Sequence, residues 1–261
     1  MFAQSRNRIL NTNYRLITSA DSSTTLYNAQ YEESYHATNE GALTESLCKH
    51  VYPSIALCNL LERPVVRILD LCFGLGYNTL CSLWAYQNFA GRLEIYSPEN
   101  DITLLQQYEI LRYPEALSPF LPLLRSLCRN KFYKSHTLTI ELHIGDARDY
   151  LHNLITRNLY FDVIYQDPFS PPKNPELWNL AHFHGLFALL APNGILTTYS
   201  QSSRALYTAH CGGFLTYRCT NTHGRDFSIC SKIALQSAAP FYLKEIDWAH
   251  KLRCNPALIP F

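Results

Sequence analysis

Acidic residues stand at the ends of four predicted strands, and a pair of glycines follows the first of them. Asp70 lies in an apolar run over residues 65–71, and Gly74 and Gly76 come next, before a helix-like pattern. A strand, a glycine turn and a helix can present a nucleotide-sized ligand at the carboxyl end of the first strand of an open α/β sheet. Glycine lets the backbone approach a ligand that a Cβ would exclude. An ordinary turn between a strand and a helix would have the same pattern, so the glycines alone leave both interpretations open.

The other three acids repeat this position on the strands that follow. Glu99, Asp146 and Asp167 each come directly after a predicted strand. Those strands span residues 92–97, 138–144 and 161–165. Because the carboxyl ends of parallel strands meet at one rim of a sheet, the four acids should converge there. S-Adenosylmethionine (SAM) carries hydroxyls, an amino group, a base and a positive charge, which suit an acidic rim, so we expect SAM as the cofactor.

Composition indicates an intracellular globular protein. The chain has 261 residues, of which 47% are hydrophobic and 16% charged, values typical of a folded domain. No apolar run reaches the ~18 residues of a membrane span, and no signal segment follows the start. The nine cysteines show no Cys-x-x-Cys spacing, and the ten histidines show no ligand spacing, so we expect no metal site and no disulfides. Reduced thiols favour a cytoplasmic location.

Two short segments are basic and contain no acid, although the net charge is only +1. They are residues 1–15 and residues 125–134. The second segment holds the side chains of Arg125, Arg129, Lys131 and Lys134, next to two aromatic residues. Such a segment is either a solvated face or a contact with the RNA backbone.

The periodicity of the chain predicts one domain over residues 1–261. We expect an N-terminal extension (1–63), a core (64–235) with an insertion at about 114–135, and a C-terminal tail (236–261) with little pattern. The extension should hold a β-hairpin at 14–27 and a helix from Leu43. Helices are expected at 79–88, 102–112, 147–155, 177–190 and 204–209, and a turn at 191–194. The last strands should be 195–199, 216–221 and 227–235, and the final two must be antiparallel because their connection is too short for a crossover helix.

The most distinctive stretch is residues 161–178. It brings Asp167 to the rim and places Phe169 two residues later, in a loop with four prolines. Prolines lower the entropy cost of holding a loop in one shape. A rigid acid beside an aromatic ring suits methyl transfer to nitrogen, because the acid accepts hydrogen bonds from an amine while the ring excludes water and can face a cation. Asp167 and Phe169 are therefore the expected catalytic residues.

Here the sequence resembles the bacterial tRNA 5-methylaminomethyl-2-thiouridine methyltransferases, the MnmC-like family. The resemblance runs from about Arg15 to Leu235 and rests on the pattern Asp-x-Phe-x-Pro-x-Lys-Asn-Pro-x-x-Trp. That pattern is present as Asp167, Phe169, Pro171, Lys173, Asn174, Pro175 and Trp178. The other matching positions are Phe73, Gly74, Gly76 and Asn78 of the glycine loop, Gly145-Asp146, the run 190–194, Tyr35-His36, and Gly41-Ala42-Leu43 with Glu45-Ser46.

The resemblance implies a Rossmann-like SAM-dependent methyltransferase fold of the α/β class. Its sheet would be mostly parallel and seven-stranded, with helices on both faces and the last strand antiparallel. SAM would be bound by Asp70, Phe73, Gly74, Gly76, Asn78, Glu99, Asp146, Ala147, Asp167 and Glu45. The substrate would be bound by Tyr35, His36, Pro171, Lys173, Asn174, Trp178 and Arg225.

The implied reaction converts 5-aminomethyl-2-thiouridine to 5-methylaminomethyl-2-thiouridine at the wobble position of tRNA. The partner would be the anticodon stem-loop, and a separate enzyme would supply the aminomethyl precursor. Long members of the family also carry a flavin-dependent oxidase half, which has no counterpart here, so we expect a stand-alone methyltransferase.

Three departures from the family and two rival functions accompany this interpretation. Cys72 stands where the family usually has glycine, Pro168 replaces a glycine, and a basic element is reduced to Gly224-Arg225-Asp226. A polyamine synthase-like aminopropyltransferase would use the same fold, but its glycine loop usually carries an acid pair that is missing here. A non-catalytic RNA-binding protein of SAM fold is the other rival. As alternatives for single residues, Trp178 can belong to the core, while His36 and Lys173 can be solvated.

Overall fold

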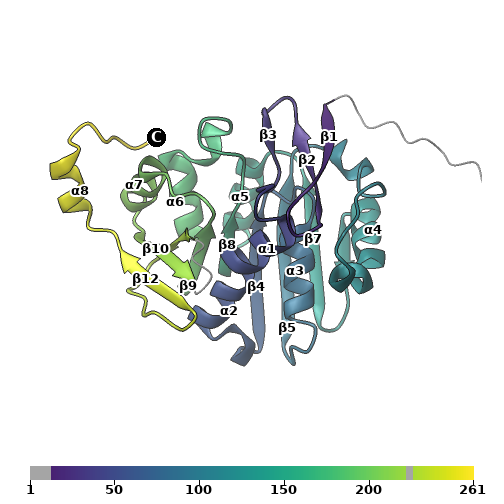
Figure 1. Ribbon diagram of the computed structural model, residues 1–261. Coiled ribbons are helices and arrows are strands. Elements are labelled where there is room, and N and C mark those ends of the chain that lie inside the picture. Colours follow the sequence, from purple (N-terminus) through teal and green to yellow (C-terminus); the bar gives the residue numbers. More distant parts are fainter. Residues whose placement is uncertain (1–12, 222–225) are drawn as a thin grey trace, which may run out of the picture.

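The computed structural model describes residues 13–221 and 226–261 and has a central nine-stranded sheet (Figure 1). Its order is β12-β10-β11-β9-β8-β4-β5-β7-β6. The parallel strands are β4 (Val65–Leu71), β5 (Arg92–Glu99), β7 (Leu138–Ile144), β8 (Phe161–Gln166) and β9 (Leu190–Thr198). The antiparallel pairs involve β10 (Leu215–Asn221), β11 (Asp226–Ser231), β6 (Phe132–Lys134) and β12 (Phe241–Glu245). The predicted α/β class, with its antiparallel final pair, is confirmed.

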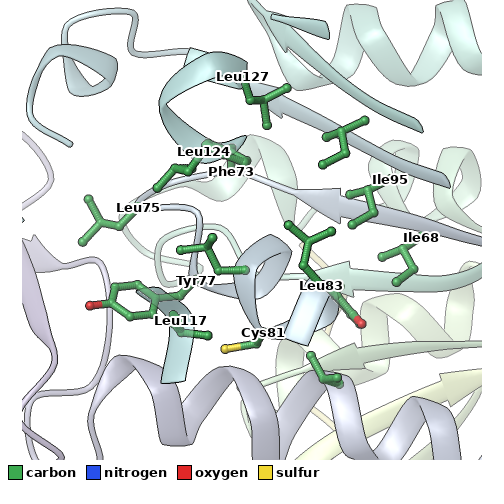
Figure 2. Packing of buried hydrophobic residues seen from close by; sticks show 14 of the residues in the cluster. Ile68, Phe73, Leu75, Tyr77, Cys81, Leu83, Ile95, Leu117, Leu124 and Leu127 are labelled. Atoms are coloured by element: carbon green, nitrogen blue, oxygen red, sulfur yellow. The ribbon is translucent and has the colours of Figure 1, made fainter. Parts of the chain in front are cut away.

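Helices cover both faces of the sheet, and the alternation of side chains along β4 explains why. Val66 and Ile68 point into one core, whereas Leu69 and Leu71 point into the other. Successive side chains of a strand face opposite sides, so a parallel strand buried on both faces is apolar throughout. The first face carries α3 (Tyr77–Ala85) and α4 (Leu121–Asn130), and Figure 2 shows side chains of both helices in one cluster with Ile68 and Ile95 of the sheet. The second face carries α5 (Ala147–Thr156), α6 (Leu180–Leu189) and α7 (Ser203–Cys211).

The N-terminal extension forms a small sheet and an interrupted helix next to α3. The sheet joins β1 (Tyr14–Thr18), β2 (Thr24–Asn28) and β3 (Glu33–Ser34), so the predicted hairpin is confirmed. The helical part consists of α1 (Ala42–Glu45), a π-helical segment (Ser46–Val51) and α2 (Tyr52–Cys58). Pro53 is the second residue of α2, so the π-helical segment ends shortly before the residue that lacks an N–H. Shorter 3₁₀ turns lie at Leu60–Glu62, Leu104–Gln106, Glu115–Phe120 and Pro175–Leu177.

The structure corrects four expectations about individual elements. Residues 102–112 do not form an α-helix: Asp101 accepts the Thr103 and Leu104 N–H groups, and only a 3₁₀ turn at Leu104–Gln106 follows before the chain continues in turns. Residues 191–194 belong to β9 rather than to a turn, and the pairing of β8 with β9 absorbs them through a register shift. The predicted helix 177–190 starts only at Leu180, after a 3₁₀ turn.

The fourth correction concerns the edges of the sheet, which has nine strands and not seven. The insertion ends in β6, which pairs with β7, and the tail supplies β12, which pairs with β10. Figure 1 shows β12 at one end of the sheet, with α8 (Trp248–Cys254) beyond it. Trp248 fixes this tail, since its Nε1 donates a hydrogen bond of 2.8 Å to Thr216 Oγ1. Its burial gives the apparently patternless tail a fixed place.

Candidate functional site

A cavity of about 710 Å³ lies where β4, β5, β7 and β8 end, and residues 30–39 of the extension form its opposite wall. Most of the residues expected to bind cofactor or substrate line it. They are Tyr35, His36, Glu45, Phe73, Gly74, Asn78, Glu99, Asp146, Ala147, Asp167, Phe169 and Asn174. The volume is within the range of about 300–1,000 Å³ typical of small-molecule sites.

The glycine loop after β4 is bent sharply and held from outside the cavity. Gly74 has φ +54°, and a Cβ there would lie 3.3 Å from Tyr35 Cδ1. The Tyr108 hydroxyl donates to the Gly74 carbonyl, and the Tyr113 hydroxyl donates to the Leu75 carbonyl at 2.8 Å. Cys72 also adopts a left-handed conformation, with φ +71°. A residue other than glycine pays about 1–3 kcal/mol for such a conformation, so Cys72 is a strained residue of this loop.

Glu99 organises the floor of the cavity. Its Oε2 accepts the Gly74 N–H and its Oε1 accepts the Asp101 N–H, each at 2.8 Å. Burial raises the pKa of Glu99 to about 7, although these backbone hydrogen bonds act in the opposite direction. Each carboxylate oxygen keeps a further lone pair, so Glu99 can accept hydroxyl donors from a ligand.

Asp146 begins α5 at the edge of the cavity. Its side chain accepts the backbone N–H of Arg148 at 2.8 Å and also pairs with the Arg148 guanidinium. The guanidinium hydrogen bond lowers the pKa of Asp146, so the carboxylate is ionised near neutral pH. Ala147 lies at the first position of the helix, where backbone N–H groups have no partner within the helix.

Asp167 lies at the end of β8 between two side chains that come from other elements. Its Oδ2 accepts a hydrogen bond of 2.9 Å from Asn78 Nδ2. Its Oδ1 lies 3.6 Å from Nε2 of His50, a histidine that the sequence interpretation did not include. A lone histidine in a predicted helix had no distinguishing signal. Asn78, which was assigned to the cofactor, lines the cavity and also contacts the expected catalytic acid.

The aromatic wall and the proline loop are fixed by partners far away in the chain. The ring of Phe169 stacks on Tyr31 at a centroid distance of 4.3 Å and lies 4.9 Å from Tyr35. Its carbonyl accepts a hydrogen bond of 2.8 Å from Trp178 Nε1. Glu33 accepts the Ser170 N–H at 3.2 Å and its hydroxyl at 2.6 Å, which joins the loop to the extension. Tyr31 and Glu33 were not predicted, because only the fold brings residues 31–33 to this loop.

A buried group of charges lies beside the aromatic wall. Glu45 Oε1 lies 3.0 Å from Lys49 Nζ, and Glu45 Oε2 accepts the Ala37 N–H at 2.8 Å. His36 Nδ1 is 3.7 Å from the same carboxylate. Burial acts to raise the pKa of Glu45, but the His36 contact and the Lys49 charge outweigh it and lower that pKa. Glu45 therefore stays ionised at the cavity wall.

Five residues expected in the site do not line the cavity, and a sixth lies outside the described residues. Asp70 lies beneath the glycine loop and accepts a hydrogen bond of 2.7 Å from Thr79 Oγ1. The others are Gly76, which packs against Phe73 at the start of α3; Pro171, which is buried; Lys173, which pairs with Glu32; Trp178, which is core; and Arg225, which lies outside the described residues. Burial and local partners keep the first five away from the ligand space.

Within residues 13–221 and 226–261, no helix is long and apolar enough to cross a membrane. Among the same residues, no group of three or more histidine, cysteine, aspartate or glutamate side chains is arranged to hold a metal ion.

The fold and the site define a class of enzyme. A family profile described as "S-adenosyl-L-methionine-dependent methyltransferase" matches residues 109–211. A spermidine synthase structure aligns with a TM-score of 0.51 at 12% identity over 95% of this chain and 78% of that one, a likeness that shows the fold alone. The chain has the fold of the SAM-dependent methyltransferases.

More similar proteins define the family. The crystal structure of MnmC2 from Aquifex aeolicus aligns with a TM-score of 0.81 and 31% identity, over 96% of this chain and 79% of that one. The chain belongs to the MnmC2 family, as its motifs predicted. The bifunctional MnmC of Azoarcus sp. is 32% identical over 73% of this chain and 31% of its own length. An uncharacterised protein of Methanocaldococcus jannaschii is 28% identical over 72% of this chain and 50% of its own length. The chain thus spans half or less of these two curated relatives.

Proposed function

We propose that this methyltransferase converts 5-aminomethyl-2-thiouridine to 5-methylaminomethyl-2-thiouridine at the wobble position of tRNA. The observation that carries the proposal is the shared cavity wall of Asp167 and Phe169, next to the glycine loop. An acid and a desolvating ring are the groups that an amine acceptor needs. The name of the Azoarcus relative, a tRNA 5-methylaminomethyl-2-thiouridine biosynthesis protein, supports the nucleoside.

The residues of the cavity fit SAM. The backbone of the glycine loop forms a cradle that a Cβ at Gly74 would narrow, and Glu99 below it offers acceptors for ribose hydroxyls. Asp146 and Ala147 stand at the cavity edge, where they can meet the adenine. When bound, SAM supplies a methyl group on a positively charged sulfur, which an uncharged amine can attack.

The acceptor must lose a proton before it can react, because a protonated amine has no lone pair. Desolvation against Phe169, with its neighbours Tyr31 and Tyr35, lowers the pKa of an amine. An ionised Asp167 acts in the opposite direction, since a carboxylate stabilises an ammonium ion. We therefore assign Asp167 mainly to orientation: it accepts an N–H hydrogen bond and aims the nitrogen lone pair. Alignment of this kind can supply several kcal/mol of the barrier.

The proposed partner is the anticodon stem-loop of tRNA, and the reaction would take place in the cytoplasm. The aminomethyl group would come from a separate enzyme. The exposed side chains of Arg125, Arg129 and Lys134 offer a surface for the RNA backbone. Lys131 of the same segment is only half exposed, and its Nζ donates to the Cys128 carbonyl.

The test is single-turnover methylation of tRNA that carries 5-aminomethyl-2-thiouridine, followed by mass spectrometry of the wobble nucleoside. We expect the gain of one methyl group, a strong loss of rate in Asp167→Ala, and a smaller loss in Asp167→Asn, which keeps one acceptor oxygen. Binding of tRNA should be nearly unchanged in both variants. Asp149→Asn, on the exposed face of α5, is the matched control.

Three outcomes would contradict the proposal or a part of it. Wild-type rates in Asp167→Ala would remove Asp167 from the mechanism. Transfer of an aminopropyl group from decarboxylated SAM to putrescine, without methylation of tRNA, would support the aminopropyltransferase instead. If tRNA binds but no product of either kind forms, the protein is a binding module.

A further inference from the structure

A buried histidine lies beside Asp167, on the side away from the cavity. His50 is fully buried, comes from the π-helical segment Ser46–Val51, and is not part of the cavity lining. Its Nδ1 lies 2.8 Å from Thr197 Oγ1, and its Nε2 lies 3.6 Å from Asp167 Oδ1. Nε2 has no hydrogen-bond partner among the described residues. A buried polar atom without a partner is unusual, and this one faces the expected catalytic acid.

The neighbours of the ring select its tautomer. A carboxylate can only accept hydrogen bonds, so it favours the form of His50 in which Nε2 carries the proton. Nδ1 is then an acceptor, and the Thr197 hydroxyl can donate to it. The separation of 3.6 Å is longer than a hydrogen bond, and catalytic hydrogen bonds are often long before the substrate binds.

The two oxygens of Asp167 therefore face two different donors. Asn78 of α3 donates to Oδ2, and Nε2 of His50 points to Oδ1. A carboxylate held at both oxygens cannot rotate freely, and its remaining lone pairs are left for a donor in the cavity. The ring of Tyr165, 5.3 Å from the imidazole between centroids, packs against His50 and limits its movement.

We propose that His50 is a positioning residue for methyl transfer. Its ring, whose tautomer is fixed with the help of the Thr197 hydroxyl, holds Asp167 in the orientation that receives the N–H of the acceptor amine. The inference rests on the proposed function, because it assigns a role in that same reaction. The proton lost by the amine does not have to reside on His50 for this role. The histidine acts only through the carboxylate, and it needs no contact with substrate.

Two substitutions distinguish the roles of the two ring nitrogens of His50. In His50→Gln, the amide nitrogen can take the place of Nε2, whereas in His50→Asn it reaches only the place of Nδ1. We expect His50→Gln to retain most of the single-turnover rate and His50→Asn to lose roughly 10- to 100-fold, the cost of a misplaced catalytic group. Affinities for SAM and tRNA should be unchanged in both. Equal rates in the two variants would overturn the proposal.

A double-mutant cycle tests whether His50 acts through Asp167. In an Asp167→Asn background, His50→Asn should cause little further loss, because the group that it positions is already altered. A full additional loss would indicate a general structural role and overturn the proposal. Thermal unfolding of each variant shows whether it is folded, and Thr197→Val, which removes the hydroxyl without touching the ring, should lower the rate in the same direction.

A spectroscopic measurement needs no substrate. In protein labelled with ¹⁵N-histidine, long-range ¹H–¹⁵N correlation spectra should show the Nε2–H tautomer for the signal that disappears in His50→Gln. That signal should shift in Asp167→Asn. The Nδ1–H tautomer would overturn the role of His50 and leave the proposed function standing, whereas a wild-type protein that does not methylate tRNA would overturn the proposed function and, with it, the role of His50 in methyl transfer.

Discussion

Replacing Glu99 by glutamine tests how the cavity holds SAM. Both carboxylate oxygens accept backbone N–H groups, from Gly74 and from Asp101. Glutamine keeps one oxygen and places an NH₂ group against one of these donors. The substitution therefore weakens the expected ribose contact and disturbs the glycine loop at the same time.

The size of the effect follows from the chemistry of the lost contact. A hydrogen bond to a charged group contributes about 1.5–3 kcal/mol, which corresponds to a rise in Kd of roughly 10- to 150-fold at pH 8. Burial raises the pKa of Glu99 to about 7, so the carboxylate protonates as the pH falls through neutrality. The protonated acid accepts hydroxyl donors poorly. Wild-type affinity should therefore fall below pH 7, by up to about tenfold for each pH unit.

Isothermal titration of SAM at pH 6, 7 and 8 measures both effects. Glu99→Gln should bind SAM weakly at all three pH values. Its SAM affinity should also lack the part of the pH dependence that comes from the titration of Glu99. Glu62→Gln, an exposed acid far from the cavity lining, is the matched control. Asp70→Asn should keep the wild-type pH dependence of SAM affinity. This control shows that the dependence comes from Glu99 and not from Asp70, the other buried acid whose pKa is raised to about 7. Unchanged SAM affinity in Glu99→Gln would refute the assignment.

Two further predictions concern stability and RNA binding. Burial raises the pKa of Asp70 from 3.8 to about 7, so the folded state binds an extra proton between about pH 4 and pH 7 and stability falls as the pH rises through that window. Asp70→Asn should therefore raise the free energy of unfolding by about 1–3 kcal/mol at pH 8, where the pKa shift allows at most about 4 kcal/mol. The gain measured by urea unfolding should be smaller at pH 5. Equal gains at both pH values would contradict this. The affinity for RNA should fall as the salt concentration rises. Replacing Arg125, Arg129 and Lys134 by alanine should make this fall less steep, by an amount that corresponds to the loss of up to about three phosphate contacts. If the salt slope and the affinity are both unchanged, the segment is a solvated face.

Sequence by itself determined the parts of this protein that depend on short-range patterns. The apolar run of β4, the glycines after it and the acids at the strand ends are local signals, since each reports the period or the turn of its own segment. The rim on which Glu99, Asp146 and Asp167 converge follows from the parallel order that those signals imply. The family motif around Asp167 identified the loop that carries the expected catalytic acid.

Tertiary structure decided which of those residues reach the cavity and what holds them. Asp70 looks like a ligand residue in sequence, yet the buried end of β4 turns it toward Thr79. His50 and Glu33 carry no local signal, and only the packing of the extension brings them to Asp167 and to the proline loop. The tail likewise becomes β12 because β10 offers it an unpaired edge. Contacts between distant segments depend on the whole packed arrangement, so no periodicity in one segment can encode them.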